Sequence, residues 1–211
     1  MKIGIIGAGH IGGVLARRLT QLGHEVTVAN SRGPETLKGL AADTGAWAGT
    51  VIDAARDKEV VIVTIPEKSV PELPKGLFEH SHAVVVDTGN YYPQRDGRIA
   101  EIESGTASSR WVSEQLGHPV VKAFNTIQFG HLLKGGRPAG DRERIALPVA
   151  ADDPNAKALV SRLIDELGFD AVDAGGLDDS WRQQPGTPVY GADLPADEAR
   201  RALTDATRER R

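Results

Sequence analysis

The sequence contains no cysteine, and only 5% of its 211 residues are Phe, Trp or Tyr. The absence of cysteine excludes disulfides, thiol catalysis and thiolate metal sites. No apolar run approaches the roughly 20 residues that a membrane-spanning helix needs. A net charge of −4 gives no electrostatic reason to expect nucleic acid or an anionic membrane as a partner. The G-x-S-x-G motif of serine hydrolases and the P-loop are also missing.

What remains fits a small enzyme of one domain, or one domain with an appendage, because 40% hydrophobic residues are enough for a core. The first apolar strand begins at residue 2, which leaves no room for a signal peptide. We therefore expect a cytoplasmic protein.

The first thirty-two residues carry the clearest motif. The apolar run at 2–6 leads directly into Gly7-Ala8-Gly9-His10-Ile11-Gly12, a G-x-G-x-x-G loop. A helix pattern at 11–22 and a second strand at 25–29 follow, which completes the βαβ context that the motif requires. Gly7 permits the tight turn, Gly9 lets a pyrophosphate approach, and Gly12 allows close helix packing. The residues from Gly7 to Gly12, His10 and Ile11 among them, are therefore predicted to bind a dinucleotide.

The end of the second strand indicates which dinucleotide. NAD-selective sites place Asp or Glu there to accept from the ribose 2′-hydroxyl, whereas this chain has Asn30-Ser31-Arg32. Ser31 can donate to a 2′-phosphate and Arg32 can clamp it, at about 1.5 to 3 kcal/mol per charge-assisted hydrogen bond. The predicted cofactor is NADP(H). The alternative is that Ser31 caps a helix starting near Pro34 and Arg32 is an ordinary surface charge.

Strand and helix signals alternate along the chain, which predicts an α/β fold of the Rossmann type: a doubly wound, mostly parallel sheet in one domain. After the first two strands, further strands are expected at 46–48, 60–65, 83–87, 119–124, 144–150 and 169–173. Helices are expected at 35–44, 51–56, 73–79, 108–116 and 154–167, with an irregular connection at 88–106. We expect residues 1–177 to form the NADP-binding domain and 178–211 an appendage.

Small and polar residues follow the predicted strands, at the edge where open α/β sheets bind ligands. Thr64-Ile65-Pro66, Asn90 and Asn125 are predicted to line this rim and to contact the cofactor. For each segment, the alternative is that Gly, Asn and Pro simply form turns.

The appendage begins with an irregular segment, residues 180–190, that contains Trp181, Arg182 and Tyr190. If it folds over the rim, it offers a stacking face and polar groups to a substrate; otherwise its aromatics only plug the sheet edge. Residues 197–211 are expected to form a solvated helix with a modest packing face, a candidate dimer contact, made of Ala199, Ala202, Leu203 and Ala206.

These motifs resemble those of the NADPH-dependent coenzyme F420 reductase (F420H2:NADP oxidoreductase) family, whose N-terminal domain is similar to that of pyrroline-5-carboxylate reductase. The resemblance covers about residues 1–177 and rests on six segments: 7–12, 22–25, 30–32, 64–66, 121–127 and 173–175. It implies that the glycine loop and the Ser-Arg pair hold NADP, that Thr64-Ile65-Pro66 borders the nicotinamide, and that a deazaflavin stacks near 125–127. It also implies a homodimer. The apolar C-terminal helices of that family have no match in 181–211.

The predicted function is hydride transfer between NADP(H) and a deazaflavin (coenzyme F420) or flavin-like ring, which needs stacked rings more than an acid or base. The alternatives are an NADPH-dependent reductase of a small carbonyl or imine, and a non-enzymatic NADP(H)-sensing module. No catalytic residue is assigned, and the candidates for that role are Asn125, Tyr91 and Arg182. The proton-donor candidates for a small substrate are His10, Tyr91, Tyr92, Lys122 and Arg182. His80 and His82 lack an evident third ligand, so no metal site is predicted.

Overall fold

The computed structural model describes residues 1–207 and has a six-stranded parallel sheet in the order β3-β2-β1-β4-β5-β6. This is the doubly wound order, with its switch point between β1 and β4. The predicted Rossmann-type fold is confirmed. The strands are β1 (Lys2–Ile6), β2 (Glu25–Ala29), β3 (Trp47–Ala48), β4 (Val60–Val63), β5 (Val84–Asp87) and β6 (Val120–Lys122).

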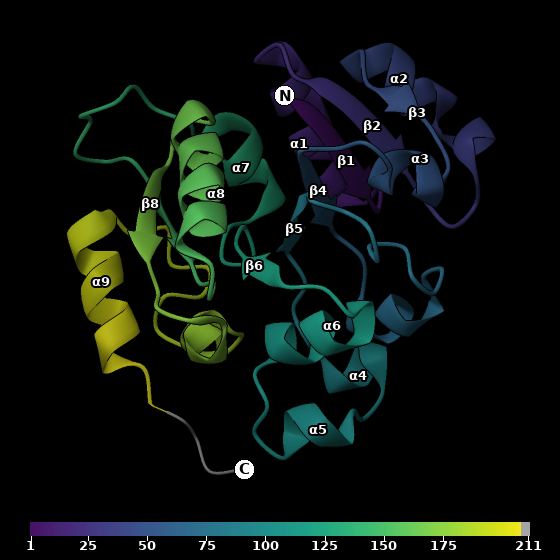
Figure 1. Cartoon of the computed structure of the whole chain (residues 1–211). Helices are drawn as coiled ribbons and strands as arrows, with labels where there is room; N and C mark the ends of the chain where they lie inside the picture. The colour runs from purple at the N-terminus through teal and green to yellow at the C-terminus, as the bar shows by residue number, and fades with distance from the viewer. Residues whose placement is uncertain (208–211) are drawn as a thin grey trace.

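Helices cover both faces of this sheet, because its central strands are apolar on both sides. In β4, Val60 and Ile62 belong to one buried cluster, whereas Val61 and Val63 belong to another. The first cluster lies under α1 (His10–Gln21), α7 (Phe129–Lys134) and α8 (Pro154–Glu166), and the second lies under α3 (Val51–Ala55). The segment formed by α2 (Lys38–Thr44), β3 and α3 lies at the β2 end of the sheet (Figure 1).

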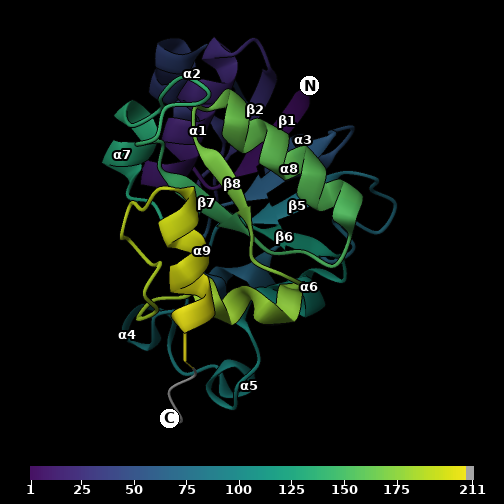
Figure 2. The ribbon, with the colours of Figure 1, turned by 90° about the vertical axis from the view of Figure 1, so that its left-hand side faces the viewer.

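The last two strands form a separate pair. β7 (Ala146–Val149) and β8 (Asp170–Asp173) are parallel to each other, and one antiparallel bridge between Lys122 and Ala150 joins them to β6. Figure 2 shows α8 and α9 (Ala196–Asp205) on either side of β8. The expected packing face of α9 is present, because Ala199, Ala202 and Leu203 are buried against this pair. Residues 208–211 of the expected helix lie outside the described residues.

One expected helix is absent from the structure, and one helix of the structure was not expected. Residues 73–79 form turns rather than a helix, after a 3-10 helix, η2 (Glu67–Glu72). The reason is local, since Pro74 has no N–H to donate and Gly76 has a φ of +68°. The six-residue α7 was not expected, because it contains Gly130 and is too short to give a helical periodicity in the sequence.

Other departures are small. The connection at 88–106 contains the one-turn helices α4 (Pro93–Asp96) and α5 (Ala100–Glu103) before α6 (Ser108–Leu116). The expected helix at 35–44 divides into a 3-10 turn, η1 (Pro34–Leu37), and α2. The segment expected to be irregular begins as a 3-10 helix, η3 (Leu177–Gln183).

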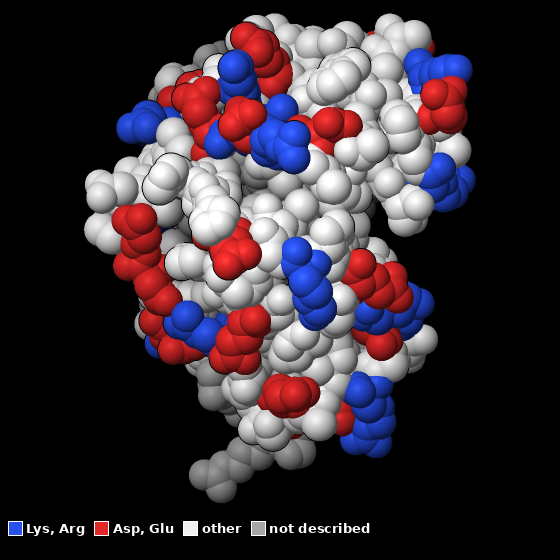
Figure 3. Space-filling view, turned by 45° about the vertical axis from the view of Figure 1, so that its right-hand side comes forward, with Lys and Arg blue, Asp and Glu red and all other residues white. Residues whose placement is uncertain are grey.

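Neither sign of charge forms a continuous band on the face shown in Figure 3. Acidic and basic side chains are interspersed over the face shown in Figure 3. No helix within residues 1–207 combines the length and the apolar character that crossing a bilayer requires.

Candidate functional site

The glycine loop connects β1 to α1 and leaves the start of that helix open. Gly9 is the N-cap of α1, no side chain caps the helix, and its first turn contains no acidic residue. The first N–H groups of a helix have no partner within it, and the positive end of the helix dipole lies beside them. The start of α1 is therefore suited to hold the two phosphates of a dinucleotide.

The three motif glycines differ in what surrounds them. A Cβ on Gly12 would lie 1.9 Å from the carbonyl oxygen of Gly7, and one on Gly7, where φ is +112°, would lie 2.3 Å from the carbonyl oxygen of Thr64. A Cβ on Gly9 would meet nothing within 4 Å. Gly7 and Gly12 thus close the turn against β4, whereas Gly9 faces the open space that a pyrophosphate would need.

The turn after β2 lies beside this loop, because the N–H of Gly7 donates to the carbonyl of Ala29 at 2.8 Å. Asn30 shapes the turn: its Oδ1 accepts from the N–H of Arg32 at 3.0 Å, and its Nδ2 donates to Thr36 Oγ at 2.9 Å. The side-chain amide of Asn30 is therefore bonded within the turn and holds the backbone that carries Ser31 and Arg32.

Ser31 and Arg32 are both exposed. The N-cap of η1 is Gly33 and not Ser31, so the capping role considered for Ser31 does not apply. No carboxylate pairs with Arg32 among residues 1–207. An exposed hydroxyl and a free guanidinium side by side fit the 2′-phosphate of NADP.

The rim predicted from the strand ends comes together in space at Asn90 and Asn125. Asn90 Nδ2 donates to the carbonyl of Asn125, and Asn125 Nδ2 donates to Asn90 Oδ1, both at 3.0 Å. Phe124, which precedes Asn125, is 2% exposed and has a φ of +62°. This strained backbone conformation costs about 1 to 3 kcal/mol and often marks functional sites. Thr64, Ile65 and Pro66 follow β4 on the same edge and are half-buried.

Several proton-donor candidates are engaged elsewhere. The Tyr91 hydroxyl donates toward Gly97 O at 3.0 Å and accepts from the N–H of Ile99 at 3.0 Å, and burial raises its pKa. The Lys122 side chain is fully buried, and its Nζ donates to Asp87 and to the carbonyl of Gly89. Neither group points a free donor at a substrate.

Arg182 is partly exposed and lies over the Trp181 ring, 5.6 Å from its centroid. Its guanidinium is 3.5 Å from Asp179. The stacking face predicted at Trp181 is thus covered by a cation on one side.

Aromatic contacts add residues to this region that sequence reasoning did not connect. The His10 ring stacks on Phe129 with centroids 4.5 Å apart, and Phe129 is 48% exposed. The hydroxyls of Tyr92 and Tyr190 are hydrogen-bonded to each other, although 98 residues separate them. Burial, and then the bond with Tyr92, raises the pKa of Tyr190.

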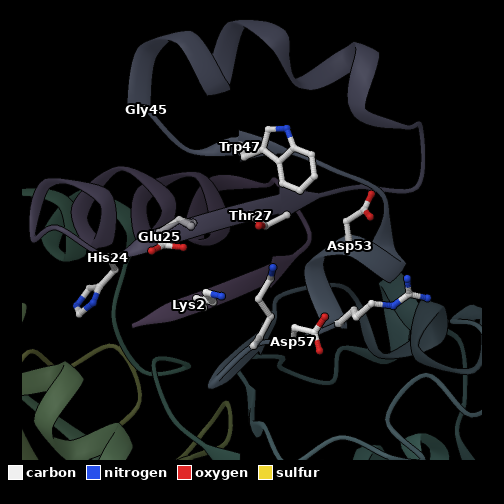
Figure 4. A pocket seen from close by; sticks show the side chains of 11 residues that line it. Lys2, His24, Glu25, Thr27, Gly45, Trp47, Asp53 and Asp57 are labelled. Atoms are coloured by element: carbon white, nitrogen blue, oxygen red, sulfur yellow. The ribbon is translucent and has the colours of Figure 1, made fainter.

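A hollow of about 600 Å³ lies away from these residues. Figure 4 shows it beside Trp47, with Lys2 and Glu25 at the starts of β1 and β2. It therefore opens at the amino ends of the strands, opposite the glycine loop. Trp47 is 63% exposed there, but no residue of the glycine loop is part of the lining.

No group of three or more His, Asp or Glu side chains within residues 1–207 is arranged to hold a metal ion. His80 and His82 are therefore in no such group among the described residues.

Comparisons with known proteins agree with the predicted family. A family model described as "NADP oxidoreductase coenzyme F420-dependent" matches residues 2–91, from β1 to the rim at Tyr91. The crystal structure of a hypothetical protein from Sinorhizobium meliloti aligns with a TM-score of 0.77 and 33% identity, over 93% of this chain and 97% of that one. A candidate F420-dependent NADP reductase from Arthrobacter sp. FB24 aligns with a TM-score of 0.68 and 25% identity, over 86% and 87%.

Among curated proteins, YjhV of Escherichia coli K12 is 46% identical over 59 residues, which are 28% of this chain and 43% of that protein. The match therefore spans less than half of that relative. Taken with the motifs at the glycine loop and the alignment over most of the fold, these similarities show that the chain belongs to the family of NADP oxidoreductases that depend on coenzyme F420.

Proposed function

We propose that this protein transfers a hydride between NADP(H) and the ring of a deazaflavin such as coenzyme F420, or of a flavin-like molecule. The observation that carries the proposal is the exposed, unpaired Arg32 beside Ser31, next to an uncapped helix start at Gly9. The family supports the same chemistry. NADPH, when bound, supplies the hydride from C4 of its nicotinamide.

The chain's own residues would hold and orient the cofactor. The N–H groups at the start of α1 would bind the pyrophosphate, and Ser31 with Arg32 would bind the 2′-phosphate. Ile65 and Pro66 would border the nicotinamide, and Asn90 and Asn125 would shape the adjoining rim.

The rim suits ring-to-ring transfer better than reduction of a small carbonyl. A hydride passing between two stacked rings requires mainly a near-attack distance of roughly 3 to 3.5 Å, whereas a carbonyl or imine requires a proton donor placed beside it. Tyr91 and Lys122, the first candidates for such a donor, are committed to other groups. Each reduced ring gains one hydride from NADPH and one proton, which solvent can supply.

The test uses the full chain with NADPH and oxidised F420, followed by the loss of the visible absorbance band of the deazaflavin; FMN is the parallel acceptor. We expect transfer to at least one ring, with a raised KM for NADPH in Arg32→Ala. The matched control is Arg162→Ala, an exposed arginine on α8. Transfer to neither ring would overturn the proposal, and NADPH oxidation by a panel of ketones and imines instead would favour the small-substrate alternative.

Three further expectations stay predictions. They are the boundary between the NADP-binding domain and the appendage at 177/178, a homodimer, and a cytoplasmic location. Sedimentation of the purified chain tests the dimer, and expression of 1–177 alone tests the boundary.

A further inference from the structure

Five charged side chains meet at the carboxyl ends of β4, β5 and β6, next to the rim. They are Glu67, Asp87, Arg95, Asp96 and Lys122. Side-chain exposure is 3% or less for all of them except Arg95, at 41%. With every group ionised, three carboxylates face two cations. The cluster would then carry one uncompensated negative charge. Because such a buried charge is costly, one carboxylate is expected to hold a proton.

Two of the carboxylates, those of Asp87 and Asp96, each accept several hydrogen bonds. Asp87 accepts from the N–H of Gly89 at 2.8 Å, from Ser109 Oγ at 2.7 Å and from Lys122 Nζ at 2.9 Å. Asp96 accepts from Arg95 at 2.8 Å and from the N–H of Tyr92 at 2.9 Å. Although burial opposes it, these bonds lower the pKa of Asp96. Both carboxylates thus have hydrogen-bond donors beside them.

Glu67 differs from them in its surroundings. Its Oε2 accepts from Arg95 Nη2 at 2.8 Å, but its buried Oε1 has no hydrogen-bond partner among the described residues. A Cβ on Gly89 would lie 2.8 Å from Glu67 Oε1 and 3.0 Å from Asp87 Oδ1. Two carboxyl oxygens thus face the same point of the turn, and only glycine leaves room for both.

The electrostatics agree with this geometry. Burial, and then the charge of Asp87, raises the pKa of Glu67 to about 7, while Lys122 opposes the shift. The charged or titratable groups that face Glu67 are Asp87 on β5, Lys122 on β6, Arg95 and Asp96 on α4, and Tyr190 in the C-terminal segment. A proton on Glu67 would leave two carboxylates facing two cations.

We propose that Glu67 is a positioning residue whose neutral carboxyl holds the Gly89–Asn90 turn and Arg95 in place beside the nicotinamide. Arg95 connects the two, because the same Nη2 donates to Glu67 and to the carbonyl of Asn90. Asn90 in turn is hydrogen-bonded to Asn125. Ionisation of Glu67 would add a second buried anion next to Asp87 and displace the turn. The kinetic consequence rests on the proposed function, but the protonation itself does not.

The proton has a measurable effect on stability. Between the ordinary pKa of 4.5 and about 7, the folded protein holds a proton that the unfolded chain has released. The stabilisation that Glu67 contributes is therefore fully present below that window and is lost as pH rises through it.

The first experiment compares thermal unfolding of the wild type and Glu67→Gln between about pH 5 and pH 8.5. The glutamine keeps the shape and removes the titration. We expect the wild-type Tm to fall by several degrees as pH rises, and most of that fall to be absent in E67Q. Glu72→Gln, an exposed acid on the same η2, is the matched control and should behave like the wild type. If E67Q keeps the wild-type pH dependence, the proposal is overturned.

The second measurement needs no variant to fold. In wild-type protein, infrared difference spectra across the same pH range should show the loss of one protonated-carboxyl band, which E67Q should lack where it folds. A spectrum without such a band contradicts the proposal.

The third measurement is turnover with the ring acceptor. Wild-type kcat should decline toward about tenfold per pH unit above the ionisation, whereas E67Q should stay within about twofold of the wild-type value at low pH and lose that decline. The Kd for NADPH should be unchanged in both. If neither ring accepts a hydride, the proposed function fails, while the melting and infrared results still decide the role of Glu67.

Discussion

Gln183 and Asn125 form a reciprocal pair: Gln183 Nε2 donates to Asn125 Oδ1 at 2.8 Å, and Asn125 Nδ2 donates to the carbonyl of Gln183 at 2.7 Å. Both side chains are buried, at 0% and 5% exposure. The N–H of Gly191 also donates to the carbonyl of Thr126 at 2.9 Å. The C-terminal segment is therefore fastened to the loop after β6, at the rim where the cofactor is proposed to bind.

Asn125→Ala should destabilise the protein, because it leaves the buried amide of Gln183 without its acceptor and Asn90 without a donor. An unsatisfied buried polar group costs about 1 to 3 kcal/mol, so we expect a loss of about 2 kcal/mol or more in urea unfolding. Gln128→Ala, three residues away and exposed, should change stability by less than about 0.5 kcal/mol. Equal effects of the two variants would show that the pair does not hold the segment.

Local signals were enough to predict the strand-loop-helix unit at the glycine motif and the buried strand β4. In both cases the information lies within about ten consecutive residues: glycines at fixed spacing, or an unbroken β-branched run such as Val60–Val63. The turn at Ser31 and Arg32 directly follows β2, so its position beside the loop could also be predicted from residues close in the sequence.

The rest depends on contacts between distant residues, which no local pattern encodes. Asn90 and Asn125 were assigned to one rim because parallel strands end on one edge, but the pairing of Asn125 with Gln183 was not expected. Glu67 gave no signal, since its burial depends on Arg95 and Asp87. Phe129 was missed together with the short helix that carries it. Proximity to His10 arises only when α7 packs beside α1.

The Tyr92–Tyr190 pair predicts a measurable coupling between the rim and the C-terminal segment. Tyr92→Phe and Tyr190→Phe each remove one hydroxyl from a partly buried hydrogen bond. A double-mutant cycle by chemical denaturation should give a coupling energy of about 1 kcal/mol. Tyr91→Phe, paired with Tyr190→Phe in the same way, should give additive effects because the Tyr91 hydroxyl bonds to Gly97 and Ile99 instead.

Arg32→Ala should change cofactor preference. Loss of the guanidinium removes charge-assisted hydrogen bonds worth about 1.5 to 3 kcal/mol each, so the Kd for NADPH should rise roughly tenfold to a hundredfold. NADH lacks the 2′-phosphate and should bind as it does to the wild type. Fluorescence titration with both nucleotides measures this, and Arg162→Ala should alter neither. Equal losses for NADPH and NADH would contradict the role assigned to Ser31 and Arg32.

Gly9→Ala and Gly12→Ala separate cofactor binding from folding. A Cβ at Gly9 meets nothing within 4 Å, and the backbone there has a φ of −75°, which alanine adopts easily. This variant should lose only about 1 kcal/mol of stability, because glycine is preferred to alanine at an N-cap. Its NADPH affinity should fall at least tenfold, because the methyl group occupies the space proposed for the pyrophosphate. At Gly12 the Cβ would lie 1.9 Å from a backbone oxygen, so that variant should unfold at a markedly lower temperature. Thermal melts without and with NADPH distinguish the two: without cofactor, G9A should melt within about 2 to 4 °C of the wild type, and it should gain little from NADPH. A G9A variant with unchanged NADPH affinity would place the phosphates elsewhere than at the start of α1.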